Sequence, residues 1–255
     1  MIYLLLGGIS AYLGACTGLG SGTLLRPLLD AVSPLPPVSI AALSTIAALA
    51  AALVSAFFML SAPLPIERDE LILLGAGGAL GGIAGDLLSA RFFSMLGPSG
   101  ATLLQNALFF TLIALPAVYF SVLSHTIRPL SLTRLASLPT ALIIGLISSF
   151  LAFGAQPITI AVYYLFFDAE HEEAACAALA ICVSALGAKL ISLLIRQRFS
   201  IAAPGTLLWL LPGALLGAFF AAFPALRIKR HGLSGEVIRL SLYAATINAF
   251  SALAS

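Results

Sequence analysis

Long apolar runs separated by short polar turns make up most of the chain. Eight runs are long enough for a helix to cross a membrane, which needs about 20 residues. They are residues 2–19, 39–60, 71–88, 101–123, 137–153, 174–195, 204–223 and 237–253. Two shorter apolar runs, 23–32 and 158–167, follow the first and the fifth. The alternation typical of a membrane β-barrel is absent. The pattern therefore predicts an all-α polytopic membrane protein, because helices satisfy their own backbone groups in lipid.

Composition supports the same class. Of the 255 residues, 61% are hydrophobic and only 9% are charged, whereas soluble domains carry about 25% charged residues. Such a small number of charges cannot cover a water-facing surface. The lipid bilayer is therefore the expected partner, and the cell (inner) membrane is the expected location. The sequence has no basic stripe with interleaved aromatic residues, which excludes nucleic acid as a partner.

A cluster of glycines interrupts the first apolar region. Residues 18–23 read Gly-Leu-Gly-Ser-Gly-Thr, and glycine favours backbone conformations that break a helix. Non-helical backbone is tolerated at membrane depth only where it is buried in protein or lines water. A half-helix beginning at Thr23 would point its positive N-terminal end into that space, which favours anions. The cluster therefore predicts an anion-binding loop.

The interruption recurs at an offset of 134 residues, where Gly154 corresponds to Gly20. In each half a broken segment, an Ala-rich helix, a Gly-rich helix and a final helix follow in the same order. Gly78 and Gly82 match Gly213 and Gly217 after one further residue of insertion. We therefore predict two membrane repeats of four elements each, residues 1–123 and 137–255, joined by a linker at 124–136. Gly-interrupted segments at corresponding positions of two halves point to a transporter's binding site.

Two topologies fit this pattern. Each broken segment either spans the bilayer, which gives eight crossings, or re-enters on the side where it began, which gives six. The re-entrant arrangement has three crossings per half and inverts the second half relative to the first. It also distributes Lys and Arg less evenly between the loops, with 227–230 in the cytoplasm and both termini outside, and is the favoured one.

Candidate substrate-binding residues offer amides, hydroxyls or positive charge close to the two breaks. They are Gly20, Ser21, Gly22, Thr23, Arg26, Ser44, Thr45, Gly154, Gln156, Thr159 and Lys189. Two of them have competing interpretations. Arg26 could instead extend to the membrane interface or pair with Asp30, and Lys189 could extend to the interface near Arg196.

Three motifs in duplicated order resemble the sulfite exporter TauE/SafE family, also called the toluene-sulfonate uptake permease family. They are the Gly18, Gly20, Gly22 break followed by Pro27, the Ala42-Leu43-Ser44-Thr45 element, and the helices with glycines four residues apart. The resemblance covers essentially the whole chain and implies passive or ion-coupled movement of small anions, often sulfur oxyanions or organosulfonates. The second half departs from the pattern, because Gly154-Ala155-Gln156-Pro157 lacks the triple glycine and Ala178-Leu179 replaces Ser44-Thr45.

We therefore expect a permease that moves a small anion (sulfite, thiosulfate, a sulfonate or another organic anion) by alternating access between two broken helices. No cofactor or metal is expected, since the three cysteines lack metal-ligand spacing. An intramembrane enzyme is disfavoured because His125, His171 and His231 all fall in loops. A channel or a non-transporting membrane scaffold is the alternative, and a homo-oligomer is compatible with the sequence.

Overall fold

The structure is a computed structural model that describes residues 1–17, 20–61, 63–118, 131–196 and 204–222. Every regular element within these residues is a helix, which confirms the all-α prediction. The helices are α1 (Ile2–Thr17), α2 (Ser21–Val32), α3 (Pro37–Leu60), α4 (Arg68–Val118), η2 (Arg134–Ala136), α5 (Ser137–Leu151), α6 (Gln156–Phe166), α7 (His171–Ile195) and α8 (Pro204–Ala222). The predicted run 237–253 and residues 124–130 of the predicted linker lie outside the described residues.

Five helical stretches in the described residues are long and apolar enough to cross a membrane: α3, α4 as far as Gly97, η2 with α5, most of α7, and α8. Helix α4 is not one straight rod. Gly97 has φ 72°, a left-handed value that glycine adopts without strain, and the chain folds back there. The Gln105 Nε2 atom consequently lies 3.3 Å from Ser89 Oγ. This turn separates the predicted runs 71–88 and 101–123.

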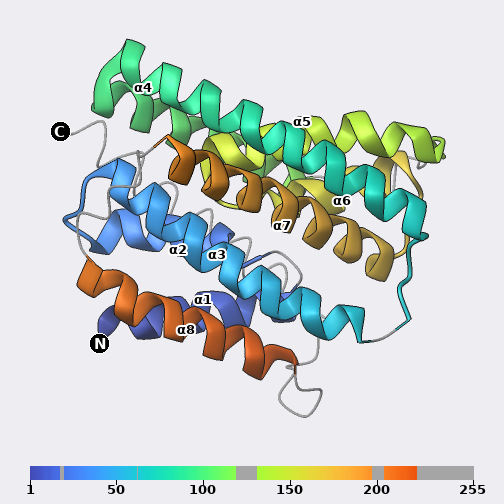
Figure 1. Cartoon of the computed structure of the whole chain (residues 1–255), viewed down its shortest axis with the longest axis horizontal. Coiled ribbons are helices and arrows are strands. Elements are labelled where there is room, and N and C mark those ends of the chain that lie inside the picture. Colours follow the sequence, from blue (N-terminus) through green and yellow to red (C-terminus); the bar gives the residue numbers. More distant parts are fainter. Residues whose placement is uncertain (18–19, 62, 119–130, 197–203, 223–255) are drawn as a thin grey trace.

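Helices α1 and α2 pack against each other as a hairpin, and α6 runs back toward the start of α5 as an open hairpin whose helices pack mainly on α7 and α4 (Figure 1). The hydroxyl oxygens of Tyr3 and Ser33, at the open ends of α1 and α2, are 3.4 Å apart. In the second hairpin the Leu132 amide donates to the Phe166 carbonyl at 2.9 Å. Each hairpin therefore ends beside the point where it began, which is the geometry of the re-entrant alternative.

Helices from the two halves of the chain interleave. Helix α1 packs against α8, and α4 packs against α5; α3 contacts α8, α7 contacts α4, and α3 contacts α7 (Figure 1). Glycines allow the closest of these approaches. A methyl group added at Gly213 or Gly217 would collide with backbone of α1, and one added at Gly77 or Gly81 would collide with backbone of α5.

The two pairs of glycines in α4 face different helices. Gly77 and Gly81 face α5 as Gly213 and Gly217 face α1, whereas Gly78 and Gly82, the pair matched from sequence, face Ile181 and Ala185 of α7. Glycines at both registers of α4 made the sequence comparison ambiguous, because either pair has the same four-residue spacing.

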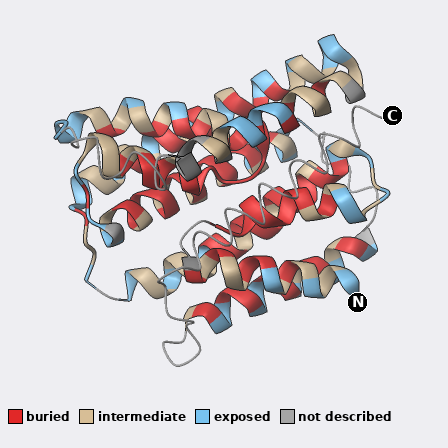
Figure 2. Cartoon of the chain, turned by 180° about the vertical axis from the view of Figure 1, so that it is seen from behind, coloured by how far each residue is buried: buried red, intermediate tan, exposed pale blue. Residues whose placement is uncertain are grey.

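Large apolar side chains are exposed along the helices, while many polar side chains are buried between them. Phe57, Leu208 and Met95 are among many large exposed apolar side chains, and Figure 2 shows buried residues on the helix faces that meet one another. Large exposed apolar surfaces mark contact with another apolar phase, which suits a multi-pass membrane protein. The buried polar residues gather around the two breaks, where the candidate site is found.

Candidate functional site

The two broken segments lie in contact with each other. At the first break Gly20 has φ 82°, and at the second Ala152, Gly154 and Ala155 have φ values of 56°, 92° and 44°. A methyl group at Gly20 would overlap the Gln156 side-chain oxygen. Ala152 and Ala155 adopt left-handed backbone conformations that interrupt the helix. The second break therefore forms without a triple glycine.

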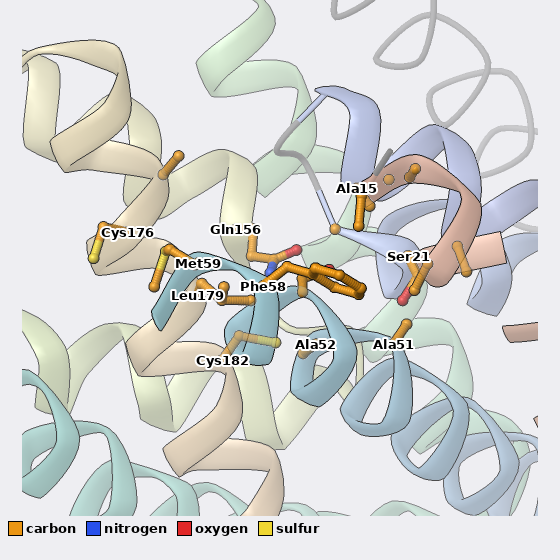
Figure 3. Close-up of a pocket in the computed structure, with 18 of the residues that line it drawn as sticks. Ala15, Ser21, Ala51, Ala52, Phe58, Met59, Gln156, Cys176, Leu179 and Cys182 are labelled. Atoms are coloured by element: carbon orange, nitrogen blue, oxygen red, sulfur yellow. The ribbon is translucent and has the colours of Figure 1, made fainter. Parts of the chain in front are cut away.

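A cavity of about 430 Å³ lies beside this junction. Gly20, Ser21, Gly22 and Gln156 line its polar end, and Figure 3 shows Ser21 and Gln156 there. The rest of the wall is mainly apolar. It includes Phe58, Met59, Leu179, Cys176, Cys182 and alanines of α1, α3 and α8. The cavity reaches the end of the molecule where Pro63, Pro65 and the exposed Glu172 lie.

Two helices begin at the polar end of this cavity. Helix α2 starts at Ser21 and α6 at Gln156. The first turn of a helix leaves backbone N–H groups without partners in the helix, and its macrodipole places partial positive charge there. Neither N-cap residue, Gly20 or Ala155, caps these amides with a side chain. The junction thus concentrates donors and positive potential, which suits an anion.

A third helix ends at the same place with the opposite polarity. Helix α5 ends at Leu151, and the last carbonyls of a helix carry partial negative charge. Four consecutive carbonyls there each accept a hydrogen bond from a side chain of a different helical stretch. The pairs are Lys189 to Ser149, Gln105 to Phe150 (2.8 Å), Arg26 to Leu151 and Ser44 to Ala152 (3.0 Å). These donors offset the negative end of α5 beside the cavity.

Arg26 and Lys189 accordingly lie inside the protein but do not line the cavity. Their exposed fractions are 3% and 4%, so neither side chain extends to the membrane interface. Arg26 also donates to Gln105 Oε1 at 2.7 Å, and its Nε lies 3.8 Å from Asp30 Oδ2, as the pairing alternative expected. Both cations contact α5 carbonyls rather than open space.

The other predicted site residues divide into two groups. Gly20, Ser21, Gly22 and Gln156 line the cavity. The remaining side chains are buried around the breaks without lining it: Thr45 and Thr159 donate to carbonyls of Ala41 (2.7 Å) and Ala155 (3.1 Å), Thr23 is fully buried, and Gly154 lies against Cys182.

Sequence reasoning missed the apolar wall of the cavity. Phe58, Met59, Cys176 and Leu179 carry no signal that separates them from ordinary membrane packing residues. The small residues of α3 at 48, 51, 52 and 55 do carry one. They recur with the spacing of a single helix face, and that face lines the cavity.

The helices, their apolar exterior and the internal cavity between broken segments define a multi-pass membrane protein. The chain belongs to the sulfite exporter TauE/SafE family, whose family model matches residues 3–248. No curated protein and no solved structure matches the chain. Because this is a transporter family, membership supports a membrane transporter of the anion type rather than an enzyme. Among the described residues, no group of three or more His, Cys, Asp and Glu could hold a metal ion.

Proposed function

We propose that the protein is a permease that binds a small anion where the N-termini of α2 and α6 meet. The observation that carries the proposal is the polarity of this junction. Two helix N-termini face the cavity while donors cover the C-terminal carbonyls of α5. The net field at the polar end of the cavity is therefore positive, although no charged side chain lines that end.

The chain consists of two inverted repeats and crosses the membrane six times. The two hairpins re-enter, and α3, the two parts of α4, α7, α8 and the predicted run 237–253 make the crossings. The interleaved contacts support this arrangement, because α1 on α8 mirrors α5 on α4, and α3 on α8 mirrors α7 on α4. Three crossings between the hairpins make the second enter from the opposite side. The inner membrane of the cell is the proposed location.

Transport then proceeds by alternating access. The cavity reaches the end of the molecule near Pro63 and Glu172, so in this conformation the binding junction communicates with that face. Relative movement of the two repeats would close this path and open one to the other face. Sulfite, thiosulfate and organic sulfonates are the proposed substrates, in keeping with the family.

The test is anion flux in proteoliposomes, measured with sulfite and with a small organosulfonate at rising concentrations. We expect saturable flux. In Gln156→Leu the flux should fall at least about tenfold, because the anion loses a hydrogen-bond donor and one of its oxygens is left unpaired in a buried site. Thr159→Val is the matched control, since its hydroxyl donates to its own helix. Linear, non-saturating flux would support the channel alternative, and no flux above empty vesicles would overturn the permease.

A further inference from the structure

The internal repeat allows the cavity to be compared with the equivalent place in the other half. The offset of 134 residues relates α3 to α7 and α1 to α5. Between α4 and α8 the glycine contacts give an offset of 136, because Gly77 corresponds to Gly213. The place equivalent to the cavity is thus enclosed by the last turns of α5, the second half of α7 and the middle of α4.

In one half this place is open and mainly apolar, and in the other it is closed and polar. The cavity-lining Ser55, Phe58, Ala15 and Ala222 correspond to Lys189, Ser192, Ser149 and Asp86, respectively. Ser192 Oγ donates to Asp86 Oδ2 at 2.7 Å, and Lys189 Nζ donates to the Ser149 carbonyl. The exposed fractions of Lys189, Ser192 and Asp86 are 4%, 8% and 5%.

Two neighbouring hydroxyls give independent information. Ser148 Oγ and Ser149 Oγ are fully buried and have no hydrogen-bond partner within the part of the chain that the structure describes. A buried hydroxyl without a partner is costly, and one adjacent to another is unusual in a permanently packed core. Both correspond to residues that line the cavity, Gly14 and Ala15. Water would reach both hydroxyls if this region opened as its counterpart does.

We propose that Lys189, Asp86 and Ser192 seal a second vestibule, the closed counterpart of the cavity, with Lys189 as its latch. This inference rests on the proposed permease function and on the inverted repeat. Lys189 ties α7 to the end of α5, while Ser192 ties α7 to α4 through Asp86. Helices α4, α5 and α7 together block the path from the opposite face to the junction. Release of these two contacts lets the three helices separate and opens that path. The opened vestibule exposes Ser148 and Ser149 to water.

The latch also makes the two access paths chemically different. The open vestibule has Ser55 and Ala222 on its walls, whereas the sealed one has Lys189 and Asp86 at the corresponding positions. An anion that crosses the protein would therefore pass an ammonium group on one side only. Removal of Lys189 frees α7 from the end of α5, and it also uncovers the Ser149 carbonyl, so access and anion affinity are measured separately.

The test is the reaction of single cysteines with a membrane-impermeant methanethiosulfonate. In a background where Cys16, Cys176 and Cys182 are replaced by alanine, Ser55→Cys reports on the open vestibule and Ser148→Cys on the sealed one. We expect Ser55→Cys to react from one face and Ser148→Cys to be protected. Adding Lys189→Met should raise the Ser148→Cys reaction rate at least about tenfold, from the opposite face, and lower that of Ser55→Cys.

Lys189→Arg is the matched control, because it keeps a cationic donor and should leave both rates near their starting values. If Lys189→Met fails to elute as a folded protein, Ser192→Ala provides the same measurement with a smaller change. Continued protection of Ser148→Cys in the folded variants would overturn the latch. Protein that shifts its labelling as expected but moves no anion would instead overturn the permease and leave the two vestibules in place.

Discussion

At the residue scale, the contact between the two breaks requires a residue without a side chain at position 20, which is Gly20. Its φ of 82° is a left-handed value, and a methyl group there would overlap the Gln156 side chain. Strained backbone of this kind costs about 1–3 kcal/mol for a residue with a side chain. The sequence was sufficient to locate the break at Gly20, because such dense glycines would destabilise a continuous helix. Gly22, expected in the break, instead lies in the first turn of α2, which begins at Ser21 and not at Thr23.

Replacement of Gly20 by alanine should therefore lower stability and displace Gln156. We expect Gly20→Ala to reduce the free energy of unfolding by at least about 1 kcal/mol, seen as a lower midpoint of thermal unfolding in detergent. Gly187→Ala is the control, because nothing lies within reach of an added methyl group there. Equal midpoints for the two variants would contradict a close contact between the breaks.

For Arg26, the residue type predicts a function or a partner, but the sequence does not identify most of its partners. A buried cation in an apolar run indicates a function or a partner, yet sequence spacing shows only the residue one turn along, Asp30. Its other acceptors, the Leu151 carbonyl and Gln105, are distant in sequence. Only the fold brings them to the guanidinium, so the sequence left both a substrate ligand and a pair with Asp30 open and did not predict the contact with the end of α5.

Arg26→Met should be strongly destabilising, by about 3–5 kcal/mol, because Asp30 and the Leu151 carbonyl lose their buried partner. The double variant Arg26→Met with Asp30→Asn should recover part of this loss, since it removes the uncompensated carboxylate. The unfolding midpoints of the single and double variants in detergent measure the difference. Additive losses would mean that the pair, at 3.8 Å, contributes nothing.

At the element scale, the helices were largely predictable and their packing was not. The observed ends of α3, α5 and α8 lie within about two residues of the predicted runs, because apolar length and polar turns define them. The left-handed alanines of the second break could not be predicted, since alanine gives no signal for that conformation. Which pair of glycines in α4 faces α5 could not be predicted either, because glycines occur at 77, 78, 81 and 82.

The α4–α5 interface offers a sharp test of close packing. Gly81→Ala should lower the unfolding midpoint, because the added methyl group collides with the carbonyl of Leu142 and overpacking costs about 1–3 kcal/mol. Gly75→Ala, in the same helix, meets nothing within reach and should leave the midpoint unchanged or slightly higher. A loss at Gly75 equal to that at Gly81 would argue against this interface.

At the scale of the whole molecule, the two hairpins decide the topology. Because the start of α1 and the end of α2 lie together, we expect the N-terminus and Ser33 on one side of the membrane and Ser61 on the other. An N-terminal epitope tag, with Ser33→Cys and Ser61→Cys labelled by an impermeant maleimide in intact cells, measures this. A tag and Ser33→Cys on opposite sides would establish the spanning alternative.

Three of the four side chains that cap the α5 carbonyls belong to the first half of the chain, and only Lys189 belongs to the second. During biosynthesis Arg26, Ser44 and Gln105 enter the bilayer before their acceptors have been made. Until Leu151 has left the translocon, the Arg26 guanidinium in the first half therefore has Asp30 and Gln105 as partners but lacks its carbonyl acceptor. Neither half can mature by itself, and coexpressed fragments divided at the linker should be stable only together.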